Sequence, residues 1–355
     1  MASPPTNIDE VKGPWLEDVL GISSLEEFSI TSPCVSIGYG SEIGFLKIVC
    51  PEPSVPANLI VKVPPKDQQR RKAVLSFGAF QKEIMFYRSI APKLPIRTPK
   101  IYTTELDRNT GAGILLLEDC SRMKSFRFNQ KPPLANELEE IVRALARLHA
   151  FWWNDTESLA RQLPNATSAD NKARTYTMEI GWRNWLKSSL PIHLPDSVVK
   201  LAHRLSNAPN QLQSHTLGKK EGTLTHMDFH LQNIFYDFEN KNDPVVVIDW
   251  DSFGIGCGPH DIAYMTSLLP ICYRRTHEEN ILNEYHKELV SLGVKDYDTN
   301  EMYSDYQFGS LIATSLQPVL MQLSRDNRED QNLLQELMMR QSQLVFDHHS
   351  EDLIN

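Results

Sequence analysis

The sequence predicts an α+β protein with two unequal lobes. A small β-rich N-terminal lobe spans residues 1–119, and a larger, mainly helical C-terminal lobe spans residues 120–355. Strand-like segments gather in the first third of the chain, at 32–40, 43–50, 58–64 and 111–120. Beyond residue 132, apolar residues recur mostly at helical spacing, and a length of 355 residues suits two lobes around a cleft.

The strand predictions rest on β-branched and apolar runs that are separated by turn residues. The Pro-rich stretch "PEPSVPA" at 51–57 separates "IGFLKIVC" from "NLIVKVP" and predicts a hairpin connection between two strands. "GAGILLLEDC" at 111–120 has the continuous apolar pattern of a buried strand and ends in two acids.

Helices are predicted where apolar residues recur every three or four positions. A short helix lies near "PWLEDVLG", and a longer one covers 76–94, where Phe80, Ile84 and Tyr87 mark one face and Pro92 ends it. "PPLANELEEIVRALARLHAFWW" at 132–153 starts with proline and keeps one apolar face throughout. The stretch "NLLQELMMRQSQLVFDHH" near the end is another amphipathic helix.

Composition excludes several classes of protein. The net charge is −9, with no block of Lys or Arg, so nucleic acid is not an expected partner. Five cysteines lie far apart without a C-x-x-C pair, which argues against a zinc site or a disulfide framework. The polar N-terminus is no signal peptide, and no apolar run approaches the roughly 20 residues of a membrane span. We expect a cytoplasmic protein, and its oligomeric state stays open.

The stretch "LTHMDFHLQNIFYD" at 224–237 carries the main functional pattern. Asp228 is followed five residues later by Asn233, and the run "VVVI" then delivers Asp249 to the end of a strand. Kinases place a catalytic Asp, a metal-binding Asn and a metal-binding Asp in this order. Asp228 would take the proton of a substrate hydroxyl, while Asn233 and Asp249 would supply oxygen ligands to Mg²⁺.

The spacing of Asp228 and Asn233 carries little weight alone, because Asp237 and Asn242 repeat it in a loop. The first lobe adds an independent signal. Lys62 lies in the predicted strand "LIVKV" and Glu83 on the following helix, which is how kinases place a phosphate-contacting Lys and the Glu that orients it. An unpaired Lys among apolar neighbours would be costly to bury, so Lys62 requires a partner.

Taken together, these motifs resemble a known superfamily. "LIVKVPP", "LLLEDC", "LARLHAFWW" and "IDWDSFGIGCGPHDIAY" resemble the aminoglycoside phosphotransferase and choline kinase superfamily, and within it the ecdysteroid kinase-like branch, over roughly residues 30–270. The resemblance implies a bilobal protein-kinase-like fold with ATP bound between the lobes. It also implies that the segment around Leu117 and Glu118 presents backbone groups to the adenine.

The chain departs from the superfamily pattern in three places. Met227 stands where the bacterial resistance enzymes usually carry Gly, and His230 stands where ecdysteroid-type members often carry Trp. The loop "IGYGSEIG" supplies Gly38, Gly40 and Gly44 and is one residue longer than G-x-G-x-x-G. We predict that this loop covers the nucleotide phosphates.

Other polar and aromatic residues have alternative roles. We expect His226 and His230 to support the loop, and Asp261 resembles a family Asp that braces it. Asp251 suits either a second metal site or a solvated strand end. Four tryptophans suit either a substrate pocket or the core of the helical lobe. These are Trp152, Trp153, Trp182 and Trp185.

The sequence therefore predicts an ATP- and Mg²⁺-dependent phosphotransferase that acts on a hydroxyl of a small molecule. A steroid, an amino alcohol, an aminoglycoside-like sugar and a lipid alcohol all remain open as acceptors. A protein kinase is disfavoured, because no A-P-E-like anchor and no long activation segment follow "IDWDSFG". A nucleotide-binding pseudokinase or scaffold remains an alternative, as does a metallohydrolase that uses His226 and Asp228.

Overall fold

The structure is a computed structural model, which describes residues 4–32, 40–76, 78–162, 179–188, 193–218, 222–323 and 328–354. The chain forms two compact units. Unit 1 comprises Met1–Lys124 and Phe235–Ser252, and unit 2 comprises Ser125–Ile234 and Phe253–Asn355. The lobe boundary near residue 120 stays a prediction.

Unit 1 is built on a five-stranded antiparallel sheet in the order β1-β2-β3-β5-β4. Its strands are β1 (Glu27–Thr31), β2 (Glu42–Val49), β3 (Asn58–Val63), β4 (Ile101–Leu106) and β5 (Gly113–Glu118). The strands predicted at 43–50, 58–64 and 111–120 are confirmed. β1 and β4 were not predicted, and most of the strand expected at 32–40 falls outside the described residues.

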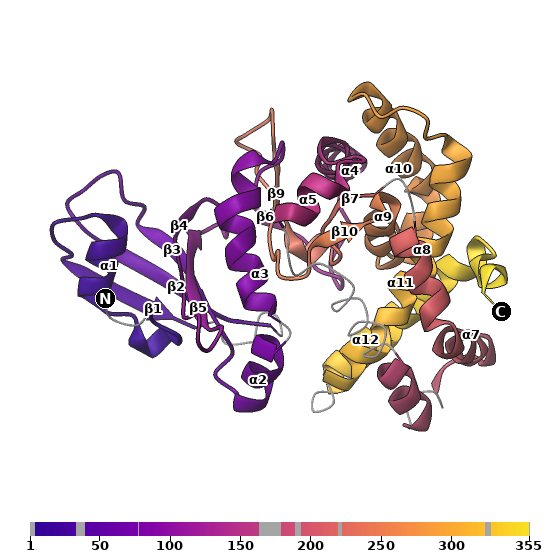
Figure 1. The fold of residues 1–355 in the computed structure, drawn as a ribbon, viewed down its shortest axis with the longest axis horizontal. Helices are drawn as coiled ribbons and strands as arrows, with labels where there is room; N and C mark the ends of the chain where they lie inside the picture. Colours follow the sequence, from indigo (N-terminus) through magenta and orange to yellow (C-terminus); the bar gives the residue numbers. More distant parts are fainter. Residues whose placement is uncertain are drawn as a thin grey trace. The chain divides into compact units, whose positions relative to one another are not determined.

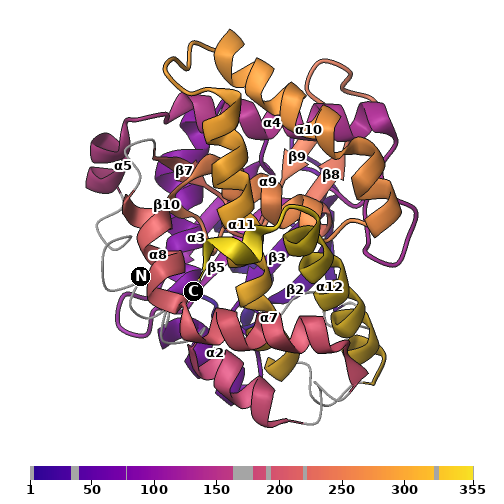
Figure 2. The ribbon, with the colours of Figure 1, turned by 90° about the vertical axis from the view of Figure 1, so that its right-hand side faces the viewer.

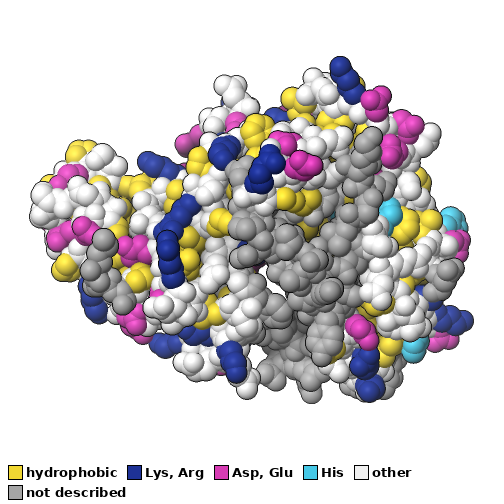
Figure 3. Space-filling view, in the orientation of Figure 1, with side chains coloured by type: hydrophobic (Ala, Val, Ile, Leu, Met, Phe, Trp, Pro, Cys, Tyr) yellow, Lys and Arg dark blue, Asp and Glu magenta, His cyan; other side chains and the backbone are white. Residues whose placement is uncertain are grey.

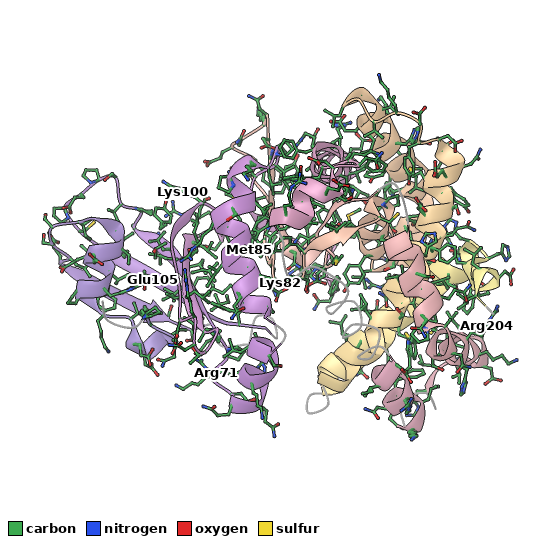
Figure 4. All side chains as sticks on the ribbon, in the orientation of Figure 1. Arg71, Lys82, Met85, Lys100, Glu105 and Arg204 are labelled. Carbon is green, nitrogen blue, oxygen red and sulfur yellow. The ribbon has the colours of Figure 1, made fainter. Side chains whose placement is uncertain are left out.

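The two faces of this sheet have different coverings, because successive side chains of a strand point to opposite faces. On one face, Val61 and Ile114 contribute to an apolar core that also contains Leu16 of α1 (Gly13–Leu20). Figure 1 shows the strands between α1 and α3. Glu105, labelled in Figure 4, accepts a hydrogen bond from Trp15 Nε1 at 2.9 Å and so ties α1 to β4.

The predicted helix over 76–94 is wrong as a single regular helix. The chain instead forms α2 (Gln68–Ser76), α3 (Ala79–Met85), a π-helical segment (Phe86–Ile90) and a 3₁₀ turn (Ala91–Lys93). Proline has no N–H, and its ring clashes with the carbonyl group four residues earlier in an α-helix. Pro92 therefore explains why the regular α-helix does not continue through residue 92.

Unit 1 also contains short strands from the segment that follows Asn233. β8 (Ile234–Tyr236) lies between β6 (Lys124–Ser125) and β9 (Val245–Val247) in a three-stranded sheet. Arg97 anchors the connecting loop, since its Nη1 lies 3.0 Å from Asp237 Oδ2 and 2.9 Å from the carbonyl oxygen of Asp243. β9 thereby has a fixed position immediately before Asp249.

Unit 2 is mainly helical. Its principal helices are α4 (Ala135–Phe151), α5 (Thr156–Gln162), a helix at 179–187, α7 (Asp196–Asn207), α8 (Pro209–Gly218), α9 (Gly258–Ser267), α10 (Ile271–Ser291), α11 (Thr299–Leu323) and α12 (Arg328–Asp347). The antiparallel pair of β7 (Thr223–Thr225) and β10 (Gly254–Gly256) lies beside the loop that carries Asp228, which begins directly after β7. The helices predicted at 132–153 and near the C-terminus are confirmed as α4 and α12.

The helices of unit 2 pack around α11, which contacts α9 and α12, while α4 packs against α10 (Figure 2). One apolar core includes Trp182 and Trp185, both of them almost fully buried. Arg204, labelled on α7 in Figure 4, donates a hydrogen bond to the carbonyl oxygen of Ile354 and holds the C-terminal end of the chain. At the start of α4, Glu137 accepts a hydrogen bond from the backbone N–H of Leu134, a common way to satisfy the first turn.

Among the described residues, no helix combines the length and the apolar character that a membrane crossing requires. On the face shown in Figure 3, Lys and Arg side chains are scattered among acidic and neutral ones.

Candidate active site

The Lys62–Glu83 pair that the sequence predicts is present in unit 1. Lys62 lies on β3 and Glu83 on α3, and they are 6% and 1% exposed. Lys62 Nζ lies 2.7 Å from Oε1 and 2.6 Å from Oε2 of Glu83. Because Val61 and Val63 face the apolar core, strand alternation turns Lys62 to the α3 side of the sheet.

Asp249 joins this pair. Its Oδ1 lies 2.7 Å from Lys62 Nζ, and its side chain is 36% exposed. The backbone of Asp249 adopts φ of 64°, which is uncommon for a residue other than glycine and is tolerated best by Asn and Asp. Such conformations are concentrated at functional sites, which is consistent with the role predicted for Asp249.

Trp250 holds the turn in place, and sequence reasoning did not identify it. Its ring stacks on Phe86 at 4.1 Å and 10°, and its Nε1 donates to the carbonyl oxygen of Val247 at 2.9 Å. The backbone N–H of Trp250 also acts to lower the pKa of Glu83, although burial and the other charges leave that pKa raised. The signal in the sequence was the Trp between two acids in "IDWD".

The charges in this cluster depend on one another. Burial acts to lower the pKa of Lys62, but the carboxylates of Asp249 and Glu83 outweigh it and raise the pKa well above the usual range for lysine. Burial raises the pKa of Glu83, and the charge of Lys62 opposes that effect. Lys62 is therefore a cation held between two carboxylates.

The predicted nucleotide-covering glycines have different surroundings. A Cβ at Gly40 would lie 3.0 Å from Oδ2 of Asp251, so the loop approaches this acid closely. Gly44 lies inside β2, where a Cβ would meet Ile30 Cγ2 at 2.6 Å, so packing alone requires glycine there. Gly38 lies outside the described residues.

Leu117 and Glu118, the predicted adenine contacts, end β5. The Glu118 backbone N–H donates to the carbonyl oxygen of Lys100 at 2.8 Å, and its carboxylate accepts from the Lys100 N–H at 3.0 Å. The structure shows their position at the strand end, and their nucleotide contact stays a prediction.

Asp228 and Asn233 lie together in unit 2. Asn233 Nδ2 donates to the backbone oxygen of Asp228 at 3.0 Å and to its Oδ2 at 3.3 Å. His230 Nε2 lies 3.6 Å from the same Oδ2, and the Asp228 side chain is 31% exposed. The carboxylate is thus oriented by its neighbours and still accessible to a substrate, as a general base must be.

Asp261 braces the loop, as the sequence predicts. Its Oδ2 accepts from the N–H of His226 at 2.7 Å and its Oδ1 from the N–H of Met227 at 2.9 Å. Met227 has φ of 63°, so two hydrogen bonds hold a left-handed residue directly before Asp228. His226 is fully buried, and its Nδ1 accepts from the Asp228 N–H at 3.3 Å, which makes it a supporting histidine.

A second layer of polar residues supports Asp261. His149 of α4 places Nε2 3.3 Å from Asp261 Oδ2 and Nδ1 2.8 Å from the hydroxyl of Tyr285. All three side chains are buried. His149 was not predicted from the sequence as a supporting residue, although a histidine on an otherwise apolar helix was itself a signal.

Asn233 and Asp249, the predicted magnesium ligands, each carry an oxygen atom of the kind that this ion takes. The side-chain hydrogen bonds of Asn233 within the described residues use Nδ2, which leaves Oδ1 as the ligand atom that Asn233 could offer. Asp249, in unit 1, offers a carboxylate, and amide and carboxylate oxygens are the hard ligands that Mg²⁺ takes. Within the described ranges, no group of three or more His, Cys, Asp or Glu side chains is arranged to hold a metal ion.

Comparison with known sequences matches the Ecdysteroid kinase-like family over residues 38–296. The chain belongs to this family. The prediction of the ecdysteroid kinase-like branch is therefore confirmed, and the matched segment contains every predicted site residue. No curated protein sequence matches the chain.

Solved structures confirm the predicted fold of this ecdysteroid kinase-like protein. A Ralstonia eutropha JMP134 protein assigned to the aminoglycoside phosphotransferases has 14% identity and a TM-score of 0.59, with 97% of this chain and 98% of that chain covered. Plasmodium vivax ethanolamine kinase has 14% identity and a TM-score of 0.53, with 91% and 83% covered. The GDP and kanamycin complex of APH(2")-IIia has 14% identity and a TM-score of 0.52, with 94% and 96% covered. At these identities the likeness is one of fold.

Proposed function

We propose that this protein is an ATP- and Mg²⁺-dependent phosphotransferase that moves the γ-phosphoryl group to a hydroxyl of a small molecule. The observation that carries the proposal is the buried cluster in which Lys62 lies within 2.7 Å of both Glu83 and Asp249. A lysine held by a helix glutamate, beside a carboxylate suited to a metal, is the arrangement that kinases use for nucleotide phosphates.

The residues divide the chemistry between them. The acceptor oxygen bonds to the γ-phosphorus, the bond from that phosphorus to the ADP oxygen breaks, and Asp228 takes the proton of the acceptor hydroxyl. Lys62 contacts the α- and β-phosphates, and Glu83 orients Lys62. Mg²⁺, held by Asn233 and Asp249, would neutralise the phosphate charge when bound.

The comparisons support a nucleotide and a small acceptor. One solved structure of the same fold is a complex with GDP and kanamycin, and another is an ethanolamine kinase. We also place the reaction in the cytoplasm, where widely spaced cysteines such as those of this chain stay reduced.

The test traces label from γ-labelled ATP, with Mg²⁺, into a fractionated extract of small molecules. Wild type is compared with Asp228→Asn, which removes the base and keeps its shape. Glu239→Gln is the control, because Glu239 is an exposed acid six residues beyond Asn233. We expect label in a small-molecule fraction with wild type and Glu239→Gln, and a loss of at least about 100-fold with Asp228→Asn.

Label in protein fractions would favour a protein kinase. Tight binding of Mg·ATP without any transfer, in extracts from several sources, would favour a nucleotide-binding scaffold. Transfer that survives in Asp228→Asn would remove this residue from its proposed role.

A further inference from the structure

The side-chain amide of Asn233 faces three acceptor atoms. Asn233 is 6% exposed, and its Nδ2 lies 3.0 Å from the backbone oxygen of Asp228, 3.3 Å from Asp228 Oδ2 and 3.4 Å from Nε2 of His230. An amide nitrogen only donates and an amide oxygen only accepts, so these neighbours decide which end of the amide faces them. Oδ1 is thereby turned to the other side, where a cation could take it as a ligand.

His230 takes part in this arrangement as an acceptor, because the amide N–H of Asn233 can only donate to it. Its Nε2 is also 3.6 Å from Asp228 Oδ2, which is too far for a hydrogen bond to the carboxylate. A neutral imidazole has one N–H and one lone pair, so a lone pair on Nε2 puts the ring proton on Nδ1.

The other ring nitrogen of His230 makes this proton position unusual. Nδ1 is buried and has no hydrogen-bond partner among the residues that the structure describes. A buried N–H without an acceptor is costly, and each such group in a folded protein calls for an explanation. The explanation that the geometry offers is that the ring presents its Nε2 lone pair to Asn233 at the expense of Nδ1.

The ring of His230 is held by residues outside the Asp228 loop. It packs edge-on against Phe128, with ring centroids 5.4 Å apart at 66°, and its centroid lies 6.1 Å from that of Tyr264 on α9. The carbonyl oxygen of Phe128 accepts a hydrogen bond at 3.3 Å from Nη2 of Arg340 on α12. Nε2 is therefore positioned by contacts that extend to two regular helices.

His230 and Asp228 differ in what happens to them during the proposed reaction. When Asp228 takes the proton of the acceptor hydroxyl, its carboxylate becomes a carboxylic acid, which can donate as well as accept. A donor beside Asn233 favours the reversed amide, in which Oδ1 faces Asp228. Nε2 of His230 remains an acceptor and opposes this reversal.

We propose that His230 is a positioning residue for the metal ligand, whose Nε2 accepts a hydrogen bond from Asn233 and so keeps Oδ1 available to Mg²⁺. This inference rests on the proposed function. Replacing a residue that orients a metal ligand commonly changes metal affinity about 10- to 100-fold. Loss of Nε2 should therefore weaken metal binding and leave the binding of metal-free ATP unchanged.

The first measurement locates the ring proton of His230 by ¹⁵N NMR of histidine-labelled protein at alkaline pH, where histidine is usually neutral. Two histidines serve as references, and each signal is assigned by the Gln variant that removes it. His277 Nδ1 donates to the carbonyl oxygen of Tyr273 at 2.9 Å, and His286 Nε2 donates to that of Tyr297 at 2.8 Å. We expect His230 to match His277. A match to His286 would overturn the inference.

The second measurement is the binding of Mn²⁺, which takes the same oxygen ligands as Mg²⁺, to the protein with ATP, by electron paramagnetic resonance. His230→Leu removes both ring nitrogens, His230→Gln retains an acceptor oxygen, and His286→Leu is the matched control at another partly buried histidine. Mn²⁺ affinity should fall at least about tenfold in His230→Leu and stay within about threefold of wild type in the other two variants. The affinity for metal-free ATP should be the same in all of these proteins.

The outcomes separate this inference from the proposed function. Equal Mn²⁺ affinity in wild type and His230→Leu would overturn the role of His230 and leave the phosphotransferase standing. An equally large loss in His230→Gln would mean that the shape of the ring matters and its acceptor atom does not, which also overturns the inference. If His230→Leu does not fold, the ring proton of wild type and the Mn²⁺ affinity of His230→Gln decide. If wild type binds no Mn²⁺ with ATP, the proposed function fails first and the inference fails with it.

Discussion

The ammonium nitrogen of Lys62 lies 2.6 Å from Oε2 of Glu83, and their side chains are 8% and 1% exposed. Breaking a pair this well buried costs more than breaking a surface salt bridge. The remaining charge would be left in an apolar environment without its partner. The pair is therefore part of the stability of unit 1 as well as a candidate phosphate contact.

Replacing Lys62 with methionine should lower the free energy of unfolding by about 3–5 kcal/mol, because Glu83 would remain buried without a cation. Lys62→Met/Glu83→Leu should recover much of this loss, since an apolar pair removes both charges. Neither variant should transfer phosphate. Chemical denaturation and the label-transfer assay measure the two effects. Lys66→Met is the control, because the Lys66–Asp9 pair is about three-quarters exposed, and its unchanged stability is expected.

Gly40→Ala and Gly44→Ala should give different defects, although both glycines belong to the same sequence motif. Gly40→Ala places a Cβ 3.0 Å from Asp251 Oδ2 and should raise the KM for ATP several-fold with little change in unfolding temperature. Gly44→Ala forces a Cβ to 2.6 Å from Ile30 Cγ2 and should cost about 1–3 kcal/mol of stability. Steady-state kinetics measure the KM of both variants, and thermal unfolding measures their stability. An unchanged KM in Gly40→Ala would argue against the phosphate-covering role of this loop.

The sequence predicted the elements whose patterns are local. The apolar run "LIVKV" was enough to place Lys62 on a strand, with its side chain on the face away from that of Val61. Helical spacing was enough to find α4. Motif order and the named resemblance identified the family, because the residues that carry it lie in short, recognisable stretches.

The remaining features depend on residues far apart in the chain. The stack of Phe86 on Trp250, which supports the Asp249 turn, joins positions 164 residues apart (250 − 86), and no local pattern encodes it. Nor does periodicity reveal the left-handed backbone of Asp249, because this conformation is imposed by tertiary contacts.

Gly258→Ala tests the buried support of the Asp228 loop. A Cβ at this position would lie 2.5 Å from the hydroxyl of Tyr285 and 2.8 Å from His149 Nδ1. The variant should lose about 1–3 kcal/mol of stability and most of its label transfer, because His149 would shift away from Asp261. Thermal unfolding and the transfer assay are the measurements.

A double variant sharpens the Gly258 test. Gly258→Ala/Tyr285→Phe removes the nearer of the two clashing atoms and should regain part of the stability. The His149 clash remains, so full recovery is not expected. If the double variant is no more stable than Gly258→Ala, the Tyr285 hydroxyl is not the atom that opposes the new side chain.

Asp347, at the end of α12, should make the stability of the protein decrease at acid pH. Burial acts to raise the pKa of Asp347, but hydrogen bonds from Arg275, Arg274 and Gln343 outweigh it and hold the pKa well below its usual range. The folded-state pKa thus lies below the unfolded one, near 4. Stability from this group is fully present above that value and is lost as pH falls further.

Asp347→Asn should therefore lower the unfolding temperature at pH 7, by an amount corresponding to about 1–2 kcal/mol, and the difference from wild type should shrink steadily below pH 4. Unfolding temperatures at pH 7, 5, 4 and 3 provide the measurement. Glu279→Gln, at an exposed position of α10, is the control and should match wild type at every pH. A gap between wild type and Asp347→Asn that persists at pH 3 would mean that the asparagine disturbs packing. The interaction of the Asp347 charge with Arg274 and Arg275 would then not be the source of the stability.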